Sequence, residues 1–396
     1  MNPGGIGSPV AQGAAGESEE RQLAWAYLSR VVLGPCPALT ALIDSVGVRE
    51  AARAVRERSL PPILRAATER RRELDLAARD LETIRALGGR LVTPDCAEWP
   101  AWRMLGLAQL TPGRDPDGAV PLVFWVRGDR NLAELTERSL AVVGARCSTG
   151  YGDRVAGAVA GDLAVHGWTV VSGAAFGIDG MAHRAALAVG GATIAVLACG
   201  PDRPYPAQHD RLLARIAETG LVVSEYPPGT DARKHHFLAR NRLIAALSDG
   251  VLVIEAGMRS GARNTVKWAR RIGRPALAVP GSVDSAASAG CHRMIRDGEA
   301  VLVTCAQEVI AETTPLHLPL IAGADVPGAR ELRDEETRVL AVLPDTGGRW
   351  PHEICAATGL SPAEVRAALV ALDLAGRAAS GGGGWRRLET SRERHG

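Results

Sequence analysis

From Ser139 onward, short apolar runs alternate with segments in which apolar and polar positions recur at helical spacing. The apolar runs span 140–143, 168–171, 193–197, 221–223, 251–254, 276–279 and 301–303. Amphipathic helices fit between them, for example over 154–165 and 208–218. Continuous apolar strands that alternate with helices indicate a parallel sheet covered on both faces. The pattern therefore predicts an α/β, doubly wound domain that extends a minimal Rossmann-like unit.

The chain before this domain follows a helical pattern. Over 19–87, apolar positions such as 25, 28, 31 and 32 recur at helical spacing, and Leu33-Gly34-Pro35 breaks the pattern between two helices. We expect a small all-helical domain there, preceded by a disordered extension over 1–18 that is rich in Gly, Ala, Pro and Ser. The α/β domain is then expected over 88–310, with an apolar lead-in strand near 122–126.

The chain after this domain predicts a third module. The Pro-, Ala- and Thr-rich segment 311–332 is typical of a linker. A helix-turn-helix is expected within 333–390, where the small residue, turn glycine and apolar anchor are Cys355, Gly359 and Val365. The glycines at 381–384 with Trp385 would form a wing, which predicts a winged-helix domain.

Charge is unevenly distributed. The whole chain has 46 basic and 44 acidic residues, whereas 233–283 holds ten Arg or Lys and only two acids, Asp249 and Glu255. Near the start of this segment, Lys234, Arg240 and Arg242 flank Phe237, one of only three phenylalanines. Cations beside an aromatic ring suit a single-stranded nucleic acid, which needs charge for its phosphates and a flat face for its bases. The alternative is a solvated helix face.

Three polar loops follow predicted strands and are expected at the same sheet edge. They begin at Gly144, Ser172 and Glu255. Glycine lets backbone N–H groups and a helix N-terminus approach an anion, and Arg146 would add a bidentate phosphate contact. The spacing is not GxGxxG, so a dinucleotide site is not expected. We expect Asp179 to brace its loop and His183 to be packed or hydrogen-bonded rather than catalytic.

Composition excludes several other classes. The seven cysteines are scattered, odd in number and lack a CxxC pair, which argues against a disulfide framework or a zinc site. No apolar run reaches transmembrane length and no signal-peptide pattern opens the chain. We therefore expect a cytoplasmic protein without membrane contact, metal or cofactor.

The residues of the central domain resemble the DNA-processing protein A (DprA/Smf) family. The resemblance covers roughly 98–309 and rests on an ordered set of segments: VGARCSTGYG, SGAAFGIDGMAH, SEYPPG, FLARNRLIAALSDGVLVIEA, RSGARNT and AVPG. It implies an extended Rossmann domain that binds single-stranded DNA, flanked by a SAM-like helical domain and a winged helix. Members of this family load the RecA recombinase onto incoming strands during natural transformation and act as dimers, without enzymatic activity.

The same resemblance implies DNA-binding residues. Arg146 would contact a phosphate from the first loop, Lys234 would pair with another, and Phe237 would stack on a base. The other implied positions are Gly144, Ser172, Gly173, Arg240, Asn241 and Arg242, with Arg263 adding positive charge. The chain departs from the family pattern at Ala145, Leu238 and Ala262-Arg263, where serine, proline and Ser-Leu are usual.

Two other functions compete with this interpretation. The fold also resembles nucleotide phosphoribohydrolases of the LOG type, but 265–268 reads Thr-Val-Lys-Trp where their catalytic acid would stand, which removes the group their chemistry needs. A duplex-DNA regulator acting through the winged helix is the second. Its expected recognition helix, over 361–374, carries one arginine, Arg366, against Glu364 and Asp373, which is poor for phosphate contact.

Overall fold

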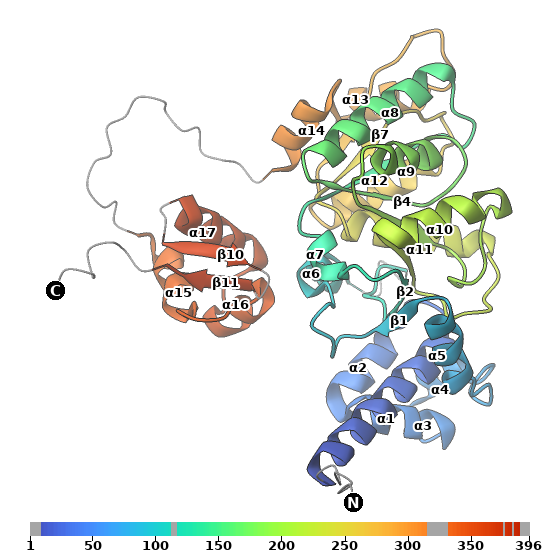
Figure 1. The fold of residues 1–396 in the computed structure, drawn as a ribbon, viewed down its shortest axis with the longest axis vertical. Coiled ribbons are helices and arrows are strands. Elements are labelled where there is room, and N and C mark those ends of the chain that lie inside the picture. Colours follow the sequence, from blue (N-terminus) through green and yellow to red (C-terminus); the bar gives the residue numbers. More distant parts are fainter. Residues whose placement is uncertain (1–8, 112–116, 315–331, 375–376, 382–383, 389–396) are drawn as a thin grey trace, which may run out of the picture. The chain divides into compact units, whose positions relative to one another are not determined.

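A computed structural model describes residues 9–111, 117–314, 332–374, 377–381 and 384–388 (Figure 1). The chain divides into two compact units, Met1–Thr313 and Thr314–Gly396. The first contains the predicted helical and α/β domains, and the second contains the C-terminal module. The predicted linker 311–332 lies largely outside the described residues, apart from the end of a helix that closes the first unit at Thr313.

The first unit is built on a nine-stranded sheet with the order β1-β2-β6-β5-β4-β3-β7-β8-β9. The strands from β3 to β9 are parallel to their neighbours, and β1 and β2 add an antiparallel edge beside β6. Their bounds are β1 Gly89–Val92, β2 Phe124–Arg127, β3 Ser139–Val143, β4 Thr169–Ser172, β5 Thr193–Leu197, β6 Leu221–Ser224, β7 Gly250–Val253, β8 Ala276–Ala278 and β9 Val301–Leu302. This confirms the predicted doubly wound α/β fold, and each predicted apolar run coincides with a strand to within a residue or two.

Helices cover both faces of this sheet (Figure 1). One layer contains α8 (Gly150–Val165), α9 (Ile178–Ala188), α10 (Asp210–Thr219) and α14 (Ala306–Thr313), which pack against one another. The other contains α11 (Lys234–Ala246) and α12 (Ala262–Arg271), with α6 (Ala101–Ala108) beside α11. The remaining short helices of the domain are α7 (Leu132–Leu135), η1 (Ala207–His209) and α13 (Ala289–Arg296).

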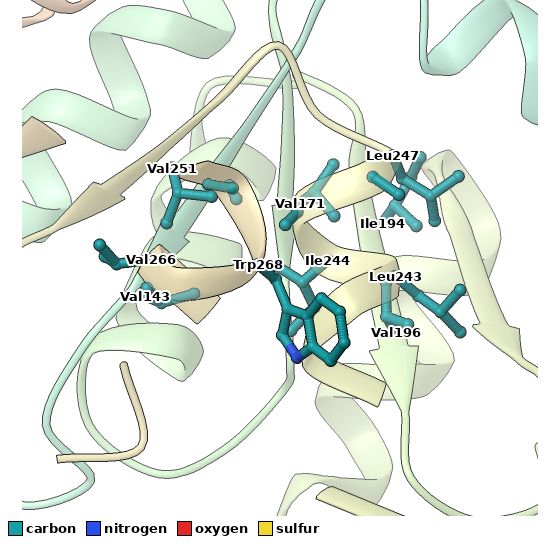
Figure 2. Close-up of a cluster of buried hydrophobic side chains, with 14 of the residues drawn as sticks. Val143, Val171, Ile194, Val196, Leu243, Ile244, Leu247, Val251, Val266 and Trp268 are labelled. Carbon is teal, nitrogen blue, oxygen red and sulfur yellow. The ribbon is translucent and has the colours of Figure 1, made fainter. Parts of the chain in front are cut away.

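The second half of α11 belongs to the core. Leu243, Ile244 and Leu247 pack against side chains from the strands, and Trp268 of α12 closes the cluster (Figure 2). Aliphatic residues dominate this cluster, as expected for a chain with 4% aromatic residues. Burial of such side chains stabilises the fold by about 1.5–3 kcal/mol each. The core therefore fixes the position of α11, and with it the position of the polar residues at its start.

Five helices form the predicted N-terminal domain: α1 (Pro9–Val32), α2 (Pro37–Val46), α3 (Val48–Arg56), α4 (Pro62–Thr68) and α5 (Ala77–Ala86). Helix α1 begins at Pro9, so the prediction of disorder over 1–18 is wrong for residues 9–18, and residues 1–8 lie outside the described part. Ala, Gln and Glu in this stretch favour a helix, and proline is well suited to its first position. The core of this domain includes Trp125 of β2, which ties the domain to the sheet edge.

The second unit is a small helical module with a two-stranded sheet. It contains α15 (Asp334–Val342), α16 (Pro351–Thr358), α17 (Pro362–Leu374), β10 (Ala378–Gly381) and β11 (Gly384–Arg387). Gly359 ends α16 in a left-handed conformation with φ of 68°, as the predicted turn glycine requires. Ile354, Val365 and Leu372 are fully buried in a core of its own.

Within the described residues, no single helix is long and apolar enough to cross a membrane. The bent pair of α16 and α17 meets that length and composition only jointly, across a 110° bend.

Candidate nucleic-acid interface

A cleft of about 430 Å³ opens at the carboxyl edge of the sheet. The sheet order places β3 beside both β4 and β7, so the direction of winding reverses at β3. Such a switch point separates the loops that follow the adjacent strands and leaves a crevice between them. The cleft is lined by the segments that follow β3, β4 and β7 and by the start of α11, with Ala175 and Asp179 contributed by the segment after β4. The predicted convergence of three loops and the basic segment is therefore present in the structure.

Two of the predicted residues meet at this cleft. The Arg146 guanidinium lies over the Phe237 ring, 5.2 Å from its centroid. Phe237 also has an aromatic neighbour in Tyr205, whose ring centroid is 5.0 Å away. The Phe237 ring is half-buried, whereas Arg146 is exposed. A cation and an aromatic face are thus available at one point of the surface, in a geometry typical of a cation–π contact.

Lys234 lies at the first position of α11, one turn before Phe237, and is exposed. Arg259, in the loop after β7, lines the cleft and is exposed, whereas Lys234 lies outside the lining, one turn from Phe237. Among the described residues, no acid forms an ion pair with Arg146, Lys234 or Arg259, although twenty ion pairs are found elsewhere. These cations are therefore available to an external anion.

Arg242 and Arg240, in contrast, are buried. The Arg242 side chain is 0% exposed and donates to Glu225 Oε1 at 2.6 Å, to the Ala239 carbonyl at 2.9 Å and to the Ala119 carbonyl at 3.0 Å. Arg240 donates to the carbonyls of Gly173 and Val196, and burial lowers its pKa to about 10. Arg242 is committed to internal acceptors and lies away from the cleft lining, so it is not positioned to contact DNA directly. Arg240 is also buried and held by internal carbonyls, but it forms part of the cleft lining.

The predicted residues of the second loop are also internal. Ser172 is fully buried and donates from Oγ to the Val142 carbonyl at 2.6 Å. A Cβ atom on Gly173 would lie 2.4 Å from Arg240 Nη1, so glycine is required there by the packing of that guanidinium. Asn241 is 8% exposed and donates to Asn264 Oδ1 at 3.1 Å. Ser172 and Gly173 therefore have supporting contacts outside the cleft lining, whereas Asn241 is part of the lining.

Arg263 is paired with an acid. Its Nε and Nη2 donate to the two Glu299 oxygens at 2.9 and 2.6 Å, a bidentate contact that raises the pKa of Arg263 and lowers that of Glu299. Arg263 therefore adds less positive charge to the cleft than its sequence position indicates, because it is neutralised by Glu299, which lies between α13 and β9.

The first glycine loop already holds an internal carboxylate. Glu255, 1% exposed, accepts from the Thr149 N–H at 2.9 Å and from Thr149 Oγ1 at 2.6 Å, at the N-terminus of α8. The Ala145 N–H donates to the Glu255 carbonyl at 2.7 Å. A Cβ atom on Gly144 would lie 2.6 Å from Ile178 Cγ1, so glycine allows close packing here. The expectation that the N-terminus of α8 receives a phosphate is wrong, because Glu255 occupies that helix end, whereas Arg146 of the same loop stays exposed in the cleft.

Two further expectations on the second loop agree with the structure. Asp179 is buried and accepts from the Gly173 and Ala175 N–H groups, so it braces the loop, and burial raises its pKa. His183 is fully buried with Nδ1 2.7 Å from Thr193 Oγ1, and burial lowers its pKa to about 3. His183 is therefore neutral and enclosed, as expected for a packed histidine.

Sequence reasoning missed Tyr205 and Arg259 as residues of this surface. Tyr205 is 45% exposed and lies in the segment between β5 and α10, about thirty residues before Phe237. The feature of the sequence that could have drawn attention to Tyr205 is the scarcity of tyrosine, since the chain has only four. Arg259 and Arg263 both lie in the polar segment after β7. The sequence does not show that Arg263 pairs with Glu299 while Arg259 stays unpaired among the described residues.

Comparison with known proteins gives consistent matches. The family described as DNA recombination-mediator protein A matches residues 91–314, and the DprA winged helix domain matches 324–384, which confirms the predicted winged helix. A putative DNA processing protein DprA from Mycobacterium tuberculosis is 47% identical over 368 residues, covering 92% of this chain and 94% of the relative. Protein Smf from Escherichia coli is 37% identical over 275 residues, covering 68% and 72%. The X-ray structure of DNA processing protein A from Streptococcus pneumoniae has a TM-score of 0.61 and 31% identity, covering 74% of this chain and 97% of that one.

Proposed function

Because the chain belongs to the DNA recombination-mediator protein A (DprA) family, whose members are mediators rather than enzymes, we propose that it binds single-stranded DNA in the cleft at the sheet switch point. The observation that carries this proposal is the contact between Arg146 and Phe237, beside Lys234 and without a neighbouring acid partner among the described residues. Arg146, Lys234 and Arg259 pair with phosphates, and the half-buried Phe237 ring stacks on a base.

This arrangement favours single strands over duplex. A base can stack on Phe237 only when it is free of its own neighbours, and each such contact contributes about 1–3 kcal/mol irrespective of base identity. Each neutralised phosphate adds about 0.7 to the salt slope of single-strand binding. Binding is therefore steeply salt-dependent and weakly dependent on sequence.

The buried predicted residues act indirectly in this proposal. Arg240 donates to the carbonyls of Gly173 and of Val196 near the end of β5. Arg242 pairs with Glu225, which lies directly after β6, and so holds α11 in place. Gly144, Ser172, Gly173 and Asn241 allow or maintain the close packing under the cleft. We assign these residues to positioning the binding surface.

Membership of this family also suggests a role for the protein in the cell. We propose that the protein acts in the cytoplasm as a homodimer that protects incoming single strands and loads RecA recombinase onto them during natural transformation. Analytical ultracentrifugation measures the oligomeric state. RecA filament formation on strands precoated with single-strand-binding protein, with and without this protein, tests the loading step.

The DNA-binding proposal is tested with fluorescent oligo(dT) and the matching duplex across a salt series. We expect Lys234→Ala, Arg146→Ala and Phe237→Ala each to weaken single-strand binding by about 5- to 100-fold, and the two cation variants to reduce the salt slope by about 0.7. Phe237→Ala should leave the slope unchanged, because it removes stacking and no charge. Lys267→Ala is the matched control, since Lys267 is the other lysine of the chain and is exposed in the middle of α12, whereas Lys234 lies one helical turn from Phe237 on α11.

Three outcomes would overturn this proposal. The first is single-strand binding that none of the three changes affects, and the second is a preference for duplex. The third is release of base from AMP by the wild type that Glu255→Ala abolishes, which would favour the LOG-type hydrolase. Tight, sequence-specific duplex binding by residues 331–396 alone would favour the winged-helix regulator instead.

A further inference from the structure

The N-terminal helical domain is held against the segment that leads into α11. Arg30, in the last turn of α1, forms a bidentate ion pair with Asp80 of α5, with Nη2 2.7 Å from Asp80 Oδ1. The same Nη2 donates to the Pro228 carbonyl at 2.5 Å. Pro228 lies in the loop after β6, five residues before Arg233. Arg30 thus links α1, α5 and this loop in a fixed arrangement.

Arg71 lies on the same side of the helical domain. Its Nη1 donates at 3.2 Å to the Val31 carbonyl at the C-terminal end of α1, directly after Arg30. Burial lowers the pKa of Arg71, and repulsion from Arg70, Arg233 and Arg30 lowers it further. Arg71 contacts the end of α1, and the adjacent Arg30 contacts the loop that leads to Arg233, so Arg70, Arg71 and Arg233 lie on adjoining segments of the helical domain and the start of α11. We call this group the basic ridge.

Among the described residues, the basic ridge has no acidic partner. Arg70 and Arg233 are exposed, and neither they nor Arg71 forms an ion pair. The neighbouring acids are engaged elsewhere: Glu69 pairs with Arg58 and Arg72, and Asp231 lies 3.9 Å from Arg203. Holding three unpaired guanidiniums together costs free energy that an anion would offset.

The anion that suits the basic ridge is the phosphate backbone of a DNA strand that is already bound in the neighbouring cleft. Arg233 directly precedes Lys234, so the basic ridge begins where the proposed DNA cleft ends. Trp25 and Tyr27, the two aromatic residues of 19–87, are both buried, so the part of the ridge on the helical domain offers charge without an exposed aromatic ring. It would therefore bind the phosphates of the DNA backbone without making base-specific contacts.

We propose that a single DNA strand leaving the Lys234–Phe237 site continues over the basic ridge, so that the N-terminal helical domain is a second phosphate-binding surface. This inference rests on the proposed function of the cleft. It assigns the helical domain a direct part in DNA binding and predicts a longer binding site than the cleft alone provides.

The test uses oligo(dT) of increasing length with the full chain. The test variant is Arg70→Gln/Arg233→Gln, which leaves the Arg71 contact with α1 intact. Wild-type affinity should increase with length until the strand reaches the ridge. The variant should match the wild type on strands of about 6 nucleotides, and on strands of about 20 nucleotides its salt slope should be shallower by about 1.4.

The matched control is Arg138→Gln, because Arg138 is exposed directly before β3, at the opposite edge of the sheet from the cleft. It should bind both lengths as the wild type does, and thermal unfolding should be unchanged in both variants. If the wild type binds both lengths and the double variant binds the long strand with an unchanged slope, the ridge proposal is overturned while the cleft proposal stands. If the wild type binds neither length, the proposed function itself fails.

Discussion

Arg242 illustrates how one residue supports the site without touching a ligand. Its guanidinium and the Glu225 carboxylate are 0% and 3% exposed, and the guanidinium donates to two carbonyls besides the acid. A charge pair desolvated to this extent adds little net stability when intact, yet removal of one partner leaves the other charge buried. The pair therefore fixes where α11 lies on the sheet.

Replacement of Arg242 tests this role. Arg242→Gln should lower the free energy of unfolding by about 3–5 kcal/mol, because Glu225 then remains buried without its partner. Adding Glu225→Gln should restore part of that loss, since two amides can hydrogen-bond without charge. Urea titrations followed by circular dichroism measure both. A fully stable Arg242→Gln variant that has lost DNA binding would instead indicate direct contact with DNA.

His183 makes the stability depend on pH. Burial lowers its pKa to about 3, whereas an unfolded chain titrates near the ordinary value of 6.5. As the pH falls below 6.5, the unfolded state takes up a proton that the folded state does not, so stability present above pH 6.5 is lost progressively toward pH 3. His183→Asn, which can retain a contact with Thr193, should show a smaller loss over this window. Thermal melts from pH 7 to pH 4 provide the comparison, and parallel curves for both proteins would contradict the assignment.

At the scale of elements, α11 combines two roles along one helix. Its first turn carries exposed Lys234 and half-buried Phe237, and after the exposed Leu238 the helix is buried from Ala239 to Ala246. The adjoining loop after β3 is fixed from the other side by Glu255 and Thr149. The cleft thus lies between two elements whose positions the core sets, which favours a preformed binding surface.

The Glu255 contact with the start of α8 gives a prediction at this scale. Glu255→Gln keeps the shape of the side chain but removes the charge that two donors and the helix dipole stabilise. We expect a loss of about 1–3 kcal/mol in unfolding free energy and faster amide exchange over 144–152. Hydrogen-exchange mass spectrometry resolves that segment, and the segment 301–313 is an internal control. Unchanged exchange over 144–152 would show that Glu255 does not hold the loop.

At the scale of the whole molecule, the two units have separate hydrophobic cores. The cleft and the basic ridge both lie within Met1–Thr313. A chain ending at Thr313 should therefore fold cooperatively and bind oligo(dT) within about threefold of the full-length protein, because no cleft residue is removed. Circular dichroism melts and fluorescence anisotropy check this. A folded fragment that no longer binds single strands would assign part of the site to the winged helix.

The sequence by itself determined the fold class, because apolar runs of strand length between amphipathic segments permit few arrangements other than a doubly wound sheet. It also placed Arg146, Lys234 and Phe237 near one edge, since strand ends and the loops after them follow from chain order. It could not separate Arg240 and Arg242 from Lys234, because residues a few positions apart on one helix face opposite sides and only packing decides which side is buried.

Tertiary structure alone decided which charges are free. Glu299 neutralises Arg263 although the two residues are 36 positions apart, and Glu225 pairs with the buried Arg242. Glu255 accepts a hydrogen bond at the start of α8, where the sequence had suggested a site for an external anion. Each of these pairings joins segments that chain order does not place together. Burial and ion pairing depend on the assembled core, so the tertiary structure decides which cations stay available to DNA. Periodicity along the chain decides only which helices and strands hold those cations.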